Sequence, residues 1–265
     1  TYGVFDVWKT EQEVRINNKN SSSGDYLVIK PQIAGTVKFR SDGNFIFQIR
    51  NSSYIRVEGF EIEGERDNIL LSTAFQYQFT YKDVNGTIQE RVPPGTPAST
   101  VATMTFPILT GTTRPSLFNS EALIAQNSHH IDLINNKISK STSAGIRIQG
   151  GDYVNVIGNT ISDCNQRTSI GTPAIVLSFL NSIDNNNGIK ITIARNKVYD
   201  NFNLVYSWNA SKSFITPLID EGKGISLEHC ITRPSPELSW QFGRVRIENN
   251  ICYGNGFSGI NTNEA

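Results

Sequence analysis

The chain has 265 residues, enough for one or two domains with a buried core, so it needs no disulfide scaffold. Its 24 basic and 24 acidic residues cancel, which excludes a global basic field for nucleic acid. No run of about 18 apolar residues occurs, so we expect no nucleic-acid partner and no insertion into a membrane. The three cysteines are an odd, sparse set, which favours three thiols over one disulfide bridge and a thiol.

The first 64 residues introduce two strand patterns. Residues 1–44 read as short strands and loops, which we interpret as the first coils of a repeat. A short strand is predicted at Phe47–Arg50. The segment Ile55–Ile62 then begins with the alternation of apolar and polar residues that is typical of a half-buried strand.

Residues 65–120 break this pattern. The sequence Val84-Asn85-Gly86 predicts a β-hairpin, and a proline-rich stretch follows at residues 93–97. The segment is too long for an ordinary loop, so we expect an inserted excursion, either functional or a small subdomain.

Both strand patterns recur regularly after residue 120. The first places an asparagine at one fixed offset, at Asn136, Asn159, Asn196 and Asn250, and Phe60 takes this place in the earlier copy. The second recurs at 122–126, 145–149, 174–178, 224–228 and 259–263. The alternation of the two patterns predicts stacked coils of parallel strands, with apolar columns inside and each asparagine amide donating to the next. Asparagine also tolerates the left-handed backbone of sharp turns.

The second pattern predicts which side chains point outward. If Ile146 and Ile148 face the core, Arg147 and Gln149 face away from it. Stacking then predicts two outward rows, which are Gln48, Ile124, Arg147, Val176, Ser226, Asn261 and Arg50, Gln126, Gln149, Ser178, Glu228, Asn263. Both rows are largely polar, so we expect a solvated face. Longer intervals after Asn159 and Asn196 predict two further excursions, and loops on a solenoid gather on its binding side.

The pattern Asn-Asn-x-Ile followed by Gly-Ile-x-Ile resembles the right-handed parallel β-helix repeat proteins, which include pectate lyases and chondroitinase- and alginate-lyase-like enzymes. The resemblance covers about residues 45–64 and 120–265, and residues 218–228 with 243–250 resemble a secreted bacterial subgroup. It implies an all-β, right-handed parallel β-helix with long loop excursions, forming a single domain over residues 1–265 that is incomplete at one or both ends. It also implies a secreted or cell-surface location and a polysaccharide partner.

The densest group of chemically active side chains lies at residues 220–229. Asp220, Glu221 and Glu228 offer the hard oxygen ligands that Ca²⁺ prefers. In a Ca²⁺-assisted β-elimination of a uronate polysaccharide, Lys223 is the candidate base, with Glu228 beside it. Arg147 is the candidate that neutralises the substrate carboxylate. The alternative is a charged turn with no chemistry.

Four further residues are candidates for substrate binding. Tyr206, Trp208 and Trp240 lie in or beside the longest interval between copies, where exposed aromatic rings stack on sugars or pack an excursion, and His229 follows Glu228. Two functions therefore stay open. One is a polysaccharide-processing or polysaccharide-binding protein of lyase-like type, with a hydrolase as a variant. The other is a non-catalytic surface or matrix protein, such as an adhesin.

Overall fold

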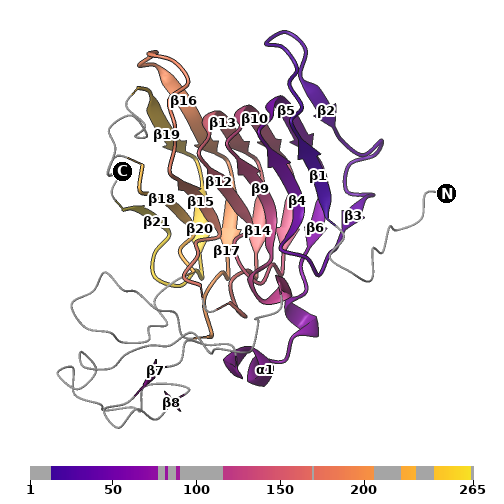
Figure 1. Cartoon of the computed structure of the whole chain (residues 1–265), viewed down its shortest axis with the longest axis vertical. Helices are drawn as coiled ribbons and strands as arrows, with labels where there is room; N and C mark the ends of the chain where they lie inside the picture. The colour runs from indigo at the N-terminus through magenta and orange to yellow at the C-terminus, as the bar shows by residue number, and fades with distance from the viewer. Residues whose placement is uncertain are drawn as a thin grey trace.

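The computed structural model describes residues 13–76, 81–82, 88–89, 116–168, 170–205, 222–230 and 242–263. Short strands form three parallel sheets that run side by side along the chain's repeat (Figure 1). Each coil contributes one strand to each sheet, so the chain is a parallel β-helix. Connections between parallel strands of one sheet are right-handed in nearly all proteins, so the β-helix is right-handed. The fold class expected from the repeat is confirmed.

The seven-stranded sheet contains the second pattern of the repeat. In spatial order its strands are β1 (Val14–Asn17), β4 (Phe45–Arg50), β9 (Glu121–Gln126), β12 (Ile146–Gln149), β15 (Ile175–Ser178), β18 (Ile225–Glu228) and β21 (Ile260–Asn263).

Two six-stranded sheets contain the first pattern, which is split by its asparagine turn. The β10 sheet has the order β19 (Arg244–Glu248), β16 (Ile189–Ala194), β13 (Asp152–Ile157), β10 (His129–Ile134), β5 (Ser53–Glu58) and β2 (Leu27–Ile29). The β11 sheet has the order β20 (Ile251–Tyr253), β17 (Lys197–Tyr199), β14 (Thr160–Ser162), β11 (Lys137–Ser139), β6 (Glu61–Glu63) and β3 (Lys38–Phe39).

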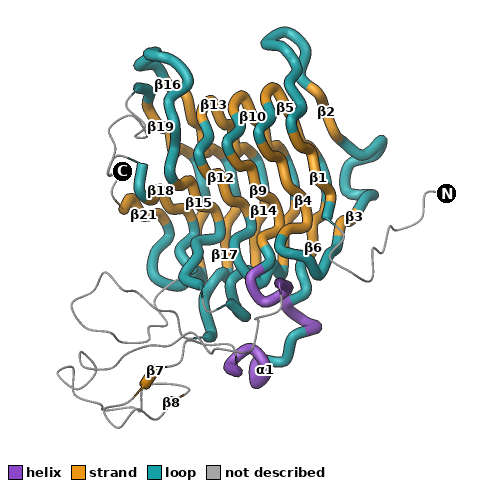
Figure 2. The backbone as a smooth tube through the Cα atoms, viewed as in Figure 1, coloured by secondary structure: helices purple, strands orange, loops and turns teal. Residues whose placement is uncertain are grey.

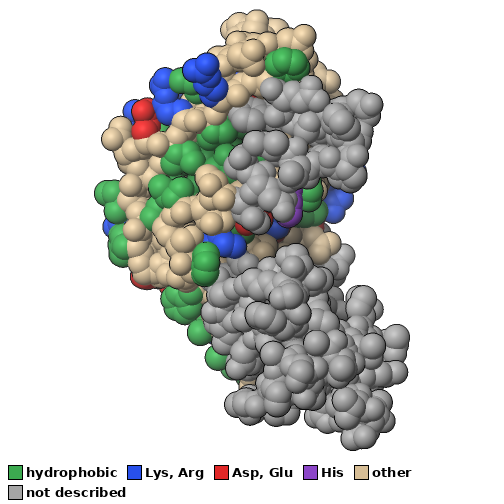
Figure 3. All heavy atoms as spheres, turned by 90° about the vertical axis from the view of Figure 1, so that its left-hand side faces the viewer, with side chains coloured by type: hydrophobic (Ala, Val, Ile, Leu, Met, Phe, Trp, Pro, Cys, Tyr) green, Lys and Arg blue, Asp and Glu red, His purple; other side chains and the backbone are tan. Residues whose placement is uncertain are grey.

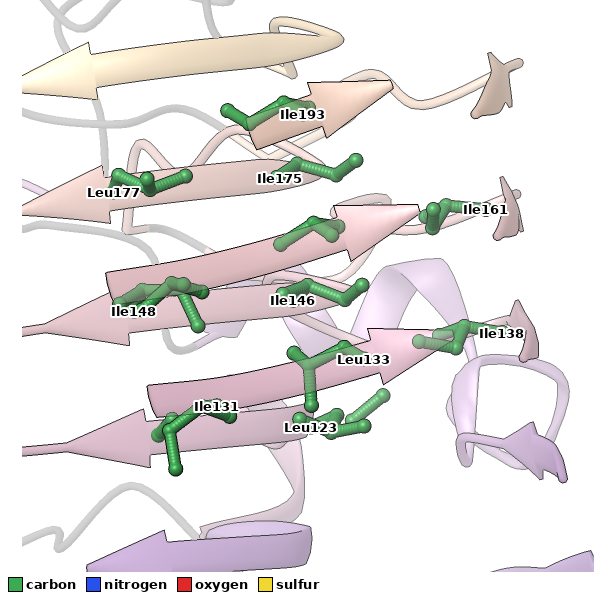
Figure 4. Packing of buried hydrophobic residues seen from close by; sticks show 14 of the residues in the cluster. Leu123, Ile131, Leu133, Ile138, Ile146, Ile148, Ile161, Ile175, Leu177 and Ile193 are labelled. Carbon is green, nitrogen blue, oxygen red and sulfur yellow. The ribbon is translucent and has the colours of Figure 1, made fainter. Parts of the chain in front are cut away.

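The core is a stack of aliphatic side chains enclosed by the three sheets. Leu123, Ile131 and Ile138 come from one coil and point toward one another, and Ile146 and Ile161 belong to the next (Figure 4). All five are fully buried. Because burying one such side chain contributes about 1.5–3 kcal/mol, this column is the main source of stability.

The asparagine ladder expected from the sequence runs along the turn between the β10 and β11 sheets. Asn136 Nδ2 donates to Asn159 Oδ1 at 3.1 Å, Asn159 Nδ2 to Asn196 Oδ1 at 3.1 Å, and Asn196 Nδ2 to Asn250 Oδ1 at 2.9 Å. The backbone N–H of Phe60 donates to Asn136 Oδ1 at 3.1 Å, so Phe60 occupies the asparagine position of its coil. The predicted ladder is confirmed.

The left-handed backbone of each turn lies one residue before the ladder asparagine. The positive φ angles belong to Asn135 (53°), Gly158 (69°), Arg195 (56°) and Asn249 (55°), and the ladder asparagines themselves are not among the residues with positive φ. The ladder asparagines therefore do not use the left-handed backbone that their residue type tolerates. The ladder residue is selected for its side-chain hydrogen bonds, and its predecessor makes the bend.

Three long connections run from the β11 sheet to the seven-stranded sheet, at residues 64–120, 163–174 and 200–224. The first contains the 3₁₀ turns Arg66–Asn68 and Ser116–Asn119, the helix α1 (Leu71–Gln76), and strands β7 (Tyr81–Lys82) and β8 (Ile88–Gln89). The pair β7–β8 is antiparallel, as the hairpin signal predicted. In Figure 2 the described loops and turns lie along the margins of the stacked strands.

The register of the seven-stranded sheet matches both predicted outward rows, but their exposure does not. Arg147 pairs with Ile124 on one side and Val176 on the other, and Val176 pairs with Ser226. However, the outward residues Gln48, Ile124, Val176, Ser178 and Ser226 are buried. The expectation of a fully solvated face is wrong. A polar row in the sequence predicts that its side chains point away from the core, but it does not predict whether other parts of the chain cover them.

The structure also describes all three cysteines as free thiols. Cys164 and Cys230 are buried, and Cys252 is half-buried. Burial raises the pKa of the Cys164 thiol to about 12. This agrees with the prediction of three thiols.

Candidate functional site

An open hollow of about 340 Å³ lies on the outward face of the seven-stranded sheet. Strands β9 and β12 supply its floor through Glu121, Ile124, Gln126, Arg147 and Gln149. Its rim combines polar and apolar side chains, which are Asn44, Phe45, Asn119 and Ile170.

Two of the rim residues come from the excursions. Asn119 ends the segment 64–120, and Ile170 lies in the segment 163–174, where Thr168 Oγ1 donates to Asn119 Oδ1 at 2.7 Å. The excursions thus return to the face that carries the hollow, as the solenoid rule predicts.

Glu121 and Arg147 form an ion pair at the centre of the hollow, between Glu121 Oε1 and Arg147 Nε. The Glu121 side chain is 12% exposed and the Arg147 side chain 21%. Burial raises the pKa of Glu121, and the guanidinium of Arg147 opposes this rise. The pair therefore places a partly desolvated acid and a cation within reach of a ligand.

Glutamine amides extend this polar floor along the solenoid axis. Gln48 Nε2 donates to Gln126 Oε1 at 3.0 Å, and Gln126 Nε2 donates to Gln149 Oε1 at 3.2 Å. An amide carries two donors and an acceptor with two lone pairs, so the row retains hydrogen-bonding capacity after these contacts. Such a row suits a ligand that is rich in hydroxyl groups.

Lys223 and Glu228 lie on the same face of the sheet, away from the hollow. Lys223 Nζ is 3.8 Å from Glu228 Oε1, which also accepts a hydrogen bond from Ser226 Oγ at 2.9 Å. The ammonium group of Lys223 lies 5.7 Å from the centre of the Phe257 ring. Glu228 is separated from Gln149 by strand β15, so Lys223 and Glu228 form one cluster and Arg147 belongs to another.

His229 follows β18 at a bend where φ is 51°. Its ring stacks on Phe179, the corresponding residue after β15, with ring centres 5.3 Å apart. The remaining predicted site residues lie outside the described residues, and they are Tyr206, Trp208, Asp220, Glu221 and Trp240.

The predicted Ca²⁺ ligands can be compared with the structure only at Glu228. Within the described ranges, no group of three His, Cys, Asp or Glu side chains is placed to hold a metal ion. Because Asp220 and Glu221 lie outside those ranges, the calcium site stays a prediction.

The sequence reasoning missed Glu121, which is the acid of the hollow. The repeat predicts a strand that begins at Ala122, whereas the strand begins one residue earlier, and Glu121 pairs with Phe45 of β4. The available signal was a charged residue directly before an apolar strand, in the coil that precedes Arg147.

A second group of charged residues lies at the start of the β10 sheet and was also missed. Lys190 Nζ contacts Asp152 Oδ2 at 3.0 Å and Asp184 Oδ1 at 2.7 Å, and the side chains of Lys190 and Asp152 are fully buried. Tyr153 OH donates to Asp184 Oδ2 at 2.8 Å. The hydrogen bond from Lys190 is the main cause that lowers the pKa of Asp184 to about 2. These contacts fasten residues 183–188 to the sheet, which is a structural role.

No family model matches the sequence, and no curated protein matches it. Among solved structures, Jun a 1, the major allergen from cedar pollen, is similar with a TM-score of 0.27 and 11% identity. The match covers 93% of this chain and 72% of that chain. The chain is a parallel β-helix protein. This assignment rests on the strand pairing, since a similarity at this level adds nothing about activity.

Among the described residues, no helix has the length and hydrophobicity needed to cross a bilayer.

Proposed function

We propose that the chain binds a polysaccharide on the outward face of the seven-stranded sheet, with the hollow around Glu121 and Arg147 as the principal subsite. The observation that carries the proposal is the lining of the hollow, where amide side chains and the ion pair lie beside Phe45 and Ile170. Sugars present hydroxyl groups at their edges and apolar C–H groups on their faces, and these match the two kinds of lining.

The repeat itself supports a polymeric ligand. Gln126, Gln149, Ser178 and Glu228 lie in register on successive strands, which are spaced about 4.8 Å apart in a sheet. A linear polymer that runs along the axis meets equivalent groups at regular intervals. Because Ser178 is buried, it interrupts the accessible part of this row between Gln149 and Glu228.

The proposal is tested by affinity electrophoresis of the purified protein through gels that contain single polysaccharides, neutral or acidic. We expect retardation by at least one polymer. Gln149→Ala should weaken the affinity for that polymer roughly tenfold, because Gln149 lines the hollow. Thr160→Ala is the matched control, since Thr160 lies on the outer side of the β11 sheet. Unchanged mobility of the native protein in every gel would contradict the proposal.

A second candidate function, elimination at a uronate, rests on Lys223 and Glu228, which form a separate cluster away from the hollow. The same polymers are therefore incubated with the protein in Ca²⁺ or in chelator, and the ultraviolet absorbance of an unsaturated product is followed. A Ca²⁺-dependent rise that Lys223→Ala abolishes supports elimination with Lys223 as base. No rise with any polymer leaves binding as the function.

A further inference from the structure

Within the proposed polysaccharide site, the charge of the hollow is balanced. Among the described residues, Glu121 and Arg147 are the two charged residues that line it, and they are paired with each other. Every other described lining residue is an amide or an apolar residue. A ligand in the hollow therefore meets no net charge from the described lining.

A carboxylate ligand is disfavoured by this arrangement. To reach Arg147 it must either displace Glu121 or lie beside it, which places two carboxylates against one guanidinium in a partly desolvated site. Like charges at such a distance repel, and a displaced Glu121 would remain buried without its partner. Arg50, which pairs with Gln126 in the register, is exposed and does not line the hollow, so solvent and salt screen its charge.

Uncharged hydroxyl groups are favoured by the same surroundings. Gln149 accepts from Gln126 through Oε1, and within the described part of the chain its two Nε2 hydrogens have no other partner. Phe45 and Ile124 provide apolar area beside these donors. Hydroxyl oxygens accept from amide donors without the desolvation cost of a carboxylate.

We propose that the hollow selects uncharged sugar units over uronates, and that Glu121 sets this preference by neutralising Arg147. The inference rests on the proposed polysaccharide-binding function and names its ligand class. Glu121 is then a specificity-determining residue, and Arg147 is held by Glu121 and does not receive a substrate carboxylate.

The test uses acidic polymers paired with their own methyl esters, so that backbone and linkage stay constant while the charge is removed. Polygalacturonate, hyaluronan and alginate are each compared with the esterified form by isothermal titration. For a polymer that binds, we expect the ester to bind roughly tenfold more tightly than the acid. The affinity of the native protein for the ester should be unchanged between about 20 mM and about 500 mM salt, because no ion pair forms with the ligand.

Glu121→Gln is the decisive variant, since it leaves the shape of the hollow and frees the charge of Arg147. We expect its affinity for the acidic polymer to rise roughly tenfold and to become salt-dependent, with little change for the ester. Glu63→Gln is the matched control. Glu63 is also a partly buried acid paired with a base, Lys38, but it lies on the β11 sheet. The control should keep the native preference.

The outcomes separate this inference from the function on which it rests. If the native protein binds acids more tightly than esters, or if Glu121→Gln leaves the preference unchanged, the inference is wrong and polysaccharide binding stands. Absence of binding by the native protein to every acid, ester and neutral polymer overturns both. If Glu121→Gln does not fold, as judged by circular dichroism, the native protein alone tests the inference. Its preference for esters over acids and the absence of a salt response are then the two results that support it.

Discussion

At the scale of single residues, the ladder asparagines contribute more than one hydrogen bond each. Asn159 Oδ1 accepts from both the backbone N–H and the side-chain Nδ2 of Asn136, at 2.9 and 3.1 Å. Its own Nδ2 donates to Leu133 O at 2.8 Å and to Asn196 Oδ1 at 3.1 Å. Both asparagines are buried, so water cannot replace these partners.

We therefore predict that Asn159→Ala lowers the free energy of unfolding by about 3 kcal/mol or more, because it leaves buried donors of Asn136 unsatisfied. Asn250→Ala is the comparison. It removes the same acceptor from Asn196, but Asn250 is half-buried, so water can take its place and the loss should be about 1 kcal/mol. Urea unfolding followed by circular dichroism measures both. Equal losses at the two positions would show that the ladder does not stabilise the coil in this way.

Three ring residues adopt left-handed backbone and stack outside the β10 sheet. Tyr54, His130 and Tyr153 have φ angles of 58°, 54° and 51°, and His130 lies between the tyrosines with ring centres 4.3 and 4.4 Å away. His130 Nδ1 is also 2.8 Å from His129 Nδ1. Since the flat faces of the rings cover one another, the ring edges are the part of the stack that faces solvent.

Burial, and then the neighbouring His129, lower the pKa of His130, although Asp152, Asp184 and Asp132 oppose them. Burial is also the main cause that lowers the pKa of His129, opposed by Asp152. The folded state thus favours the neutral rings. Their contribution to stability is present above the unfolded pKa of about 6.5 and is lost as the pH falls through the lower folded values.

The expected outcome is a fall in the unfolding free energy between about pH 7 and pH 5, and a shallower fall in His130→Phe. Phenylalanine keeps a ring in the stack, and Phe179 already adopts a φ of 52° in this chain. Tyr54→Phe, which removes no group that titrates in this range, serves as the control. Parallel pH profiles for His130→Phe and the native protein would rule out His130 as the titrating group.

At the scale of elements, close backbone contact between coils restricts some glycines. A Cβ on Gly64 would clash with the backbone carbonyl of Lys140 and lie 2.6 Å from Ser141 Cα, in the connection that leaves β6. A Cβ on Gly24 would meet nothing within 4 Å. Neither glycine has a positive φ, so the two positions differ in space and not in backbone strain.

Gly64→Ala should accordingly destabilise the protein by about 1–3 kcal/mol through overpacking, while Gly24→Ala should be neutral or slightly stabilising. Thermal unfolding of both variants and the native protein makes the comparison. A similar melting temperature for all three would mean that the coils at Gly64 separate easily.

The register of the strands was predictable because each coil repeats the same local pattern. The alternation around Ile146 and Ile148 determines which side chains share a row, and the asparagine offset aligns the coils. The hollow was not predictable, since it depends on where Asn119 and Ile170 return from their excursions. Arg147 lies on the outward face, as the alternation predicted, but its partner Glu121 was missed because strand β9 begins one residue before the recurring segment 122–126.

At the scale of the whole molecule, the stacked strands of each coil pair only with strands of the neighbouring coils. The central strands β10 and β13 are paired on both sides, whereas β19, β20 and β21 each have one partner. On this last coil Ile251, Phe257 and Ile260 are about half exposed or more, and Figure 3 shows hydrophobic side chains gathered on this end. Stability should therefore decrease from the centre toward the ends.

Hydrogen exchange provides the measurement. We expect the amides of β10 and β13 to exchange at least roughly 100-fold more slowly than those of β19–β21, because end coils open without the rest of the solenoid. Uniform protection of all coils would instead indicate a single cooperative unit.

The asparagine ladder gives this chain a dipole along the solenoid axis, although its net charge is zero. In the bonds between rungs, each Nδ2 donates to the Oδ1 of the later coil, and each Oδ1 accepts from the earlier coil. The amide dipoles therefore add along the axis, as peptide dipoles do in an α-helix, while the dipoles of the sheets themselves largely cancel. The negative pole points toward Phe60 and the positive pole toward Asn250. The solenoid thus has two electrostatically different ends, even though its basic and acidic residues are equal in number.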